Sequence, residues 1–144
     1  MIQVHGSCVE IDGRGVLLRG ASGRGKSDLA LRLIDRGARL VADDRVDLNE
    51  QAGVLTASAP EPIAGRLEVR GVGIISVAAV AAAPLELVVE LVELEDVERL
   101  PEPRFSSFLG INIPLIRLVA SEASAAAKVR LAVRSLGRGE TAAP

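Results

Sequence analysis

One glycine-rich segment has the residue types and the spacing of a phosphate-binding loop. It consists of Gly20, Ala21, Ser22, Gly23, Arg24, Gly25, Lys26 and Ser27, and it matches the pattern G-x-x-x-x-G-K-[ST]. Glycines let successive backbone N–H groups point inward and form a nest for phosphate oxygens. In such a loop the lysine reaches the β- and γ-phosphates and the serine hydroxyl ligates Mg²⁺. The segment therefore predicts binding of a nucleotide or a phosphate.

Two adjacent carboxylates, Asp43 and Asp44, follow the next apolar run of the chain. If this run is a buried strand, the pair lies at the carboxyl edge of a sheet, where ligands bind in open α/β folds. A carboxylate there could hold Mg²⁺ through water or take a proton from an attacking hydroxyl group. The plainer interpretation is a solvated turn, and the neighbouring phosphate loop favours the functional one.

Two further residues are ambiguous on spacing alone. Glu68 precedes the closely spaced Gly71 and Gly73, which suits a tight turn near a ligand but equally a surface glutamate. His5 is the only histidine, and a lone histidine near an amino terminus is usually incidental.

The elements that must position these groups can be read from hydrophobic patterns. Residues 16–18 form a continuous apolar run typical of a covered strand, and residues 29–34 repeat at helical spacing, with Gly37 placed to end the helix. Residues 39–42 then indicate another buried strand. This order predicts a β-α-β unit in which the two strands pair in parallel.

The rest of the chain predicts further elements of one α/β domain. We expect strands at 9–12, 85–94 and 111–118, the last at a sheet edge because of Pro114. We also expect a hairpin at 46–56, an irregular connection at 57–63, a flexible loop at 99–108 and a helix at 121–136 that Ser121 or Ser124 caps. The domain covers residues 1–137, and 138–144 are expected to be a disordered tail.

Composition narrows the function classes. The chain has 144 residues, a net charge of −2 and 1% aromatic residues. It lacks the basic field and the stacking platforms of nucleic-acid-binding proteins. The single Cys8 excludes an internal disulfide and a cysteine-rich zinc site. Without a signal peptide or an apolar run long enough to span a bilayer, the expected location is the cytoplasm, with no membrane partner.

Several segments together resemble the catalytic domain of HPr kinase/phosphorylase. They are His5, the phosphate loop, the run R-G-A-R-L-V-A-D-D at 36–44, and L-E-V-R-G-V-G-I-I at 67–75. The resemblance covers roughly residues 4–77 and continues more weakly to about residue 136. Because His5 lies almost at the start, the chain is most similar to the short form found in alphaproteobacteria, without the long N-terminal domain.

The resemblance implies a fold, an activity and a set of site residues. The fold is a P-loop kinase core related to phosphoenolpyruvate carboxykinase, a mixed β-sheet with flanking helices. The activity is ATP- and Mg²⁺-dependent phosphorylation of a serine of HPr, the phosphocarrier protein of a phosphotransferase system, together with removal of that phosphate by phosphorolysis. It leaves open whether the chain forms a homo-oligomer.

The roles carried over by motif are as follows. The loop binds ATP, with Lys26 on the phosphates and Ser27 on Mg²⁺. Asp44 is the base that deprotonates the HPr serine, Asp43 supports Asp44 and the metal, and Glu68 is a further Mg²⁺ ligand. His5 orients the acidic centre. Arg99 resembles a family arginine that precedes a Leu-Gly pair, although Pro101 stands where glycine is expected.

The resemblance also has a departure that bears on the reverse reaction. Residues 118–124 stand in place of a basic P-V-R-P-G-R-N loop that the family ties to phosphorolysis. Two other functions remain open from the residues themselves: a small-molecule kinase that uses the same loop, and a nucleotide-responsive module whose output is partner binding.

Overall fold

The computed structural model describes residues 1–137, so the predicted tail at 138–144 lies outside the described residues. Nine strands form one curled sheet in the described part of the chain. They are Ile2–His5 (β1), Ser7–Ile11 (β2), Arg14–Arg19 (β3), Arg39–Ala42 (β4), Arg45–Gln51 (β5), Val54–Ser58 (β6), Ala82–Leu91 (β9), Arg104–Phe108 (β10) and Ile111–Leu118 (β11). The strand order is β1-β5-β6-β9-β3-β2-β4, and β11 joins β9 and carries β10 on its other side.

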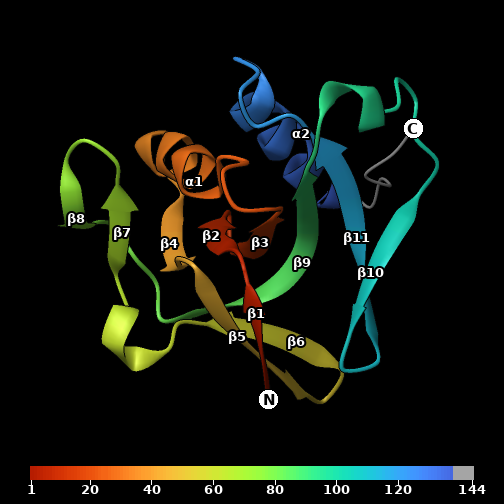
Figure 1. Ribbon diagram of the computed structural model, residues 1–144. Coiled ribbons are helices and arrows are strands. Elements are labelled where there is room, and N and C mark those ends of the chain that lie inside the picture. Colours follow the sequence, from red (N-terminus) through yellow and green to blue (C-terminus); the bar gives the residue numbers. More distant parts are fainter. Residues whose placement is uncertain (138–144) are drawn as a thin grey trace.

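The remaining elements cover the sheet or stand beside it. The helices are Lys26–Asp35 (α1) and Ala125–Gly137 (α2), and two short 3-10 turns occupy Glu61–Ile63 and Leu94–Asp96. A separate two-stranded sheet is formed by Arg66–Val69 (β7) and Gly73–Ser76 (β8). Figure 1 shows both helices on one side of the large sheet, with the β7–β8 hairpin and the β10–β11 hairpin at opposite ends. No helix within residues 1–137 is both long and apolar enough to cross a membrane.

The predicted strand–loop–helix–strand order is confirmed, but the predicted direct pairing of the two strands is wrong. Strand β2 lies between β3 and β4 and is antiparallel to both. The reason is the tight turn at Asp12 and Gly13, both with positive φ, which folds β2 back onto β3 as a hairpin. Because β9 occupies the other side of β3, β4 must pair with β2. The carboxyl ends of β3 and β4 therefore meet at one edge, together with the amino end of β2.

The C-terminal half of the chain departs from prediction in two places. The second part of the expected loop 99–108 is a strand, β10, because a turn at Leu109 and Gly110 pairs it with β11. The predicted edge position of 111–118 is wrong, since β11 lies between β10 and β9. Pro114 has no N–H group to donate to a neighbouring strand. It lies opposite Phe105 of β10, and it is tolerated because pairing with β9 starts only at the next residue, Leu115.

The observed boundaries of several other elements differ from the predicted ones by a few residues. Helix α1 and the β5–β6 hairpin are confirmed, and Gly37, with φ of 105°, follows the end of α1 as predicted. Strand β9 runs from 82 to 91 and not from 85 to 94, and β6 extends to Ser58 inside the expected irregular connection. The last helix begins at Ala125, directly after Ser124, because backbone turns at Val119–Glu122 and Glu122–Ala125 precede it.

Aliphatic side chains fill both faces of the sheet. One cluster joins the sheet to α1 and α2, and the other lies on the face away from the helices. Strand β3 contributes to both, because alternate side chains point to opposite faces: Leu18 lies in the helix-side cluster and Leu17 in the other, both fully buried. Each such burial contributes about 1.5–3 kcal/mol, so the edge where β3 ends is firmly positioned.

Candidate active site

The glycine-rich loop connects the end of β3 to the start of α1, as the sequence predicted. Gly23 and Gly25 have φ values of 86° and 91°, in the left-handed region that favours glycine. A Cβ on Gly20 would stand 2.9 Å from the Leu91 carbonyl oxygen, and one on Gly25 would stand 3.2 Å from the Ala120 Cβ. The loop is thus packed tightly against the end of β9 and the segment before α2, which fixes its path.

Charged side chains hold the two ends of the loop. The Lys26 ammonium group donates hydrogen bonds to the carbonyl oxygens of Gly20 at 2.8 Å and Ala21 at 3.3 Å. Arg24 forms an ion pair with Glu93, just beyond β9. Lys26 therefore lies across the start of the loop and has polar but uncharged partners, which a phosphate group could replace.

Asp43 accepts hydrogen bonds from three elements at the edge of the sheet. Its Oδ1 accepts hydrogen bonds from the hydroxyl groups of Ser27 at 2.9 Å and Ser7 at 2.7 Å, and its Oδ2 accepts one from the backbone N–H of Glu68 at 3.5 Å. Asp43 is 8% exposed, and no cation pairs with it within residues 1–137. The carboxylate therefore links the first turn of α1, the amino end of β2 and strand β7.

Asp44, by contrast, is open to solvent. Its φ of 70° is a left-handed conformation that aspartate tolerates, and it reverses the chain between β4 and β5. The side chain is 71% exposed, with His5 Nδ1 3.9 Å from Oδ1 and Arg45 Nε 3.9 Å from Oδ2. His5 reaches this position because β1 pairs with β5, which places His5 opposite Arg45. The two carboxylates are thus separated into a buried structural one and an open one.

The predicted metal ligands are only partly assembled. Ser27 and Asp43 are brought together, and their oxygen atoms are the ligand type that Mg²⁺ prefers, so these two residues fit the ion. Glu68 lies beside them through its backbone, while its side chain is exposed. No group of three or more His, Cys, Asp or Glu side chains suited to a metal ion occurs within residues 1–137.

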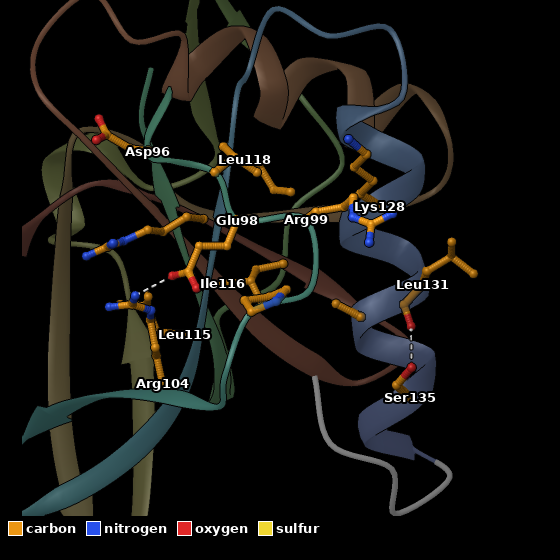
Figure 2. Close-up of a pocket in the computed structure, with 14 residues that line it drawn as sticks. Asp96, Glu98, Arg99, Arg104, Leu115, Ile116, Leu118, Lys128, Leu131 and Ser135 are labelled. Atoms are coloured by element: carbon orange, nitrogen blue, oxygen red, sulfur yellow. Dashed lines mark hydrogen bonds and ion pairs between the residues drawn. The ribbon is translucent and has the colours of Figure 1, made fainter. Parts of the chain in front are cut away.

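Arg99 is not brought to the acidic pair. It lines a cavity of about 300 Å³ between α2, β11 and the segment 96–101. Figure 2 shows Arg99 reaching toward Lys128 of α2, with Glu98 paired to Arg104 on the side of the cavity away from α2. His5 and Gly20 line a different cavity. The catalytic role given to Arg99 therefore stays a prediction without geometric support.

Sequence reasoning missed Ser7. It is 1% exposed and makes the shortest hydrogen bond to Asp43. No motif marks it, and only the unpredicted insertion of β2 between β3 and β4 brings its side chain to the site. The one signal in the sequence was its place two residues after His5.

The fold and the loop together define the class of protein. A mixed, curled sheet with helices on one face and a glycine-rich loop between β3 and α1 is a P-loop kinase core of the type seen in phosphoenolpyruvate carboxykinase, which confirms the predicted fold class. Residues 1–136 match the family model of the HPr Serine kinase C-terminal domain, and the chain belongs to this family.

Known relatives agree with this assignment. HPr kinase/phosphorylase from Prosthecochloris aestuarii is 43% identical over 128 residues, covering 81% of this chain and 38% of the relative. The protein of that name from Clostridium tetani is 55% identical over 75 residues, covering 52% of this chain and 25% of the relative. The chain therefore spans well under half the length of these relatives. The solved Hpr(Ser) kinase/phosphatase from Coxiella burnetii matches with a TM-score of 0.87 and 32% identity, over 96% of this chain and 98% of that chain.

Proposed function

We propose that this chain carries the catalytic centre of an ATP- and Mg²⁺-dependent serine kinase that acts on an HPr-type phosphocarrier protein. The observation that carries the proposal is that the two carboxylates at the sheet edge differ in burial and in contacts. Ser27 of the phosphate loop donates a 2.9 Å hydrogen bond to the buried Asp43, while the neighbouring Asp44 is 71% exposed. The names of the relatives supply the acceptor class.

The loop side of the site binds the phosphate donor. Bound Mg²⁺ would neutralise charge on the donor phosphates, with Ser27 and Asp43 holding it and Glu68 available as a further ligand. Lys26 exchanges the carbonyl groups of Gly20 and Ala21 for the β- and γ-phosphates. Because few aromatic residues exist to stack on a base, the phosphates supply most of the binding free energy.

The acceptor side of the site activates a serine hydroxyl. Asp44 accepts the hydroxyl proton while the serine oxygen forms a bond to the γ-phosphorus, and the bond from that phosphorus to the bridging oxygen of the donor breaks. His5, 3.9 Å from the Asp44 carboxylate, orients it. Because the Asp44 side chain is exposed, it can contact a serine on a protein surface, whereas the buried Asp43 could not.

The reverse reaction is expected to be weaker than the kinase reaction. Residues 118–124 contain no Lys or Arg, and Arg32 of α1 fixes this segment by donating hydrogen bonds to the carbonyl oxygens of Ala120 and Glu122. Phosphorolysis needs a second anion, inorganic phosphate, next to the donor site, and this segment supplies no cation to attract it. The proposal also places the protein in the cytoplasm, where a free, buried thiol such as Cys8 is stable.

The proposal is tested by incubating the protein with HPr, ATP and Mg²⁺ and measuring the intact mass of HPr. We expect one added phosphate, located on serine, with Lys26→Met as the inactive control. An added phosphate that small alcohols suppress would favour the small-molecule kinase. ATP binding that leaves HPr unmodified, but changes its affinity for the protein, would favour the regulatory module. Either result would overturn the assignment as a kinase of HPr.

A further inference from the structure

A second cavity, of about 280 Å³, lies directly beside the start of the phosphate loop. Its lining includes His5, Arg19, Gly20, Glu90 and Ser106. His5 also approaches Asp44, and Gly20 is the first residue of the loop, so the cavity connects the donor side and the acceptor side of the proposed active site. None of the motifs in the sequence includes Arg19.

Arg19 is oriented by its place on β3. It follows Leu17 by two residues, so its side chain leaves the sheet on the face away from the helices. There its guanidinium carbon lies 5.5 Å from the centre of the Phe108 ring. This is within the distance of a cation–π contact, which helps to fix the position of the guanidinium group.

The charges around Arg19 are unbalanced. Within residues 1–137 no carboxylate forms an ion pair with Arg19, although the side chain is only partly exposed. The carboxylate directly across from it, Glu90, is engaged by Arg117 at 2.8 Å. The acidic group of the cavity is thus already neutralised, and the cavity carries one uncompensated positive charge next to the loop.

We propose that Arg19 binds the phosphate dianion on the acceptor side of the transfer, with the Ser106 hydroxyl group as a second donor. The dianion is either the phosphoserine formed on the acceptor or free inorganic phosphate. Arginine suits both, because its edge donates two parallel hydrogen bonds to two phosphate oxygens. This inference rests on the proposed function and names a residue that holds a phosphate dianion beside the donor site.

The first arm of the test needs no acceptor protein. Inorganic phosphate is titrated by calorimetry into the full chain saturated with ADP and Mg²⁺, using wild type, Arg19→Gln, Arg19→Lys and Arg14→Gln. Arg14 is the matched control, since it lies at the other end of β3 and pairs with Glu86. We expect Arg19→Gln to weaken phosphate binding at least tenfold, Arg19→Lys to weaken it less, and Arg14→Gln to leave it unchanged.

The second arm identifies the source of the dianion. The affinities of HPr and of serine-phosphorylated HPr are compared for the same variants. A tenfold loss in Arg19→Gln that affects only phosphorylated HPr assigns the site to phosphoserine, and a loss confined to inorganic phosphate assigns it to the free ion. Equal affinities of wild type and Arg19→Gln for both inorganic phosphate and serine-phosphorylated HPr would overturn the inference. A wild type that binds phosphate but cannot phosphorylate HPr would refute the proposed function instead.

Discussion

The substitution Ser7→Ala tests whether the buried carboxylate of Asp43 is held as the structure describes. Ser7 is 1% exposed, and its hydroxyl group donates a 2.7 Å hydrogen bond to Asp43 Oδ1. A hydrogen bond to a charged group contributes about 1.5–3 kcal/mol. Because Ser27 continues to donate to the same oxygen atom at 2.9 Å, we expect the free energy of unfolding to fall by about 2 kcal/mol.

The assay is urea unfolding at pH 7, with Ser107→Ala as a control on an exposed serine of β10. A double-mutant cycle adds Asp43→Asn, which removes the charge of the acceptor. In that background the effect of Ser7→Ala should shrink to about 1 kcal/mol or less. A loss below about 0.5 kcal/mol in the wild-type background, or equal losses in both backgrounds, would refute the reasoning.

Three other substitutions test separate features. Burial raises the pKa of the Cys8 thiol from 9.0 to about 12, so the thiol ionises in the unfolded chain before it does in the folded one. When the pH is raised from 8 to 10, wild type should therefore lose about 1.4 kcal/mol more free energy of unfolding than Cys8→Ala, as measured by urea unfolding. Arg39→Met should cost about 2 kcal/mol in the same assay at pH 7, because it leaves the buried Glu10 without its ion pair. Gly25→Ala should weaken ATP binding at least tenfold in calorimetry and lower stability by about 1–2 kcal/mol, because φ is 91° and the new Cβ meets Ala120.

Local patterns predicted the parts of the site that lie close together in sequence. The phosphate loop and the helix after it are one continuous segment, so spacing alone placed Lys26 and Ser27 correctly relative to the loop. The pair Asp43 and Asp44 was also expected at the end of a buried strand. What spacing did not reveal is that Asp43 is buried while Asp44, in its left-handed conformation, is 71% exposed.

Long-range pairing was harder to predict, because it depends on which strand edges remain open. The β2–β3 hairpin and strand β9 occupy both edges of β3, and this brought Ser7 into the site and forced β4 outward. The same limitation applies to β10, whose Pro-flanked sequence resembles a loop until its pairing with β11 is known. The resemblance to a family placed Arg99 near the catalytic centre, whereas the structure places it in the cavity beside α2.

The central claim is that Asp44 is the base of a serine kinase reaction on HPr. The most direct test is the rate of serine phosphorylation of HPr by wild type and Asp44→Asn at saturating ATP and Mg²⁺, with ATP affinity measured separately by calorimetry. We predict that kcat falls by about 10²–10⁴-fold while ATP affinity stays within twofold, because the exposed carboxylate acts only on the acceptor. Phosphorylation of HPr by Asp44→Asn at the wild-type rate would contradict this account.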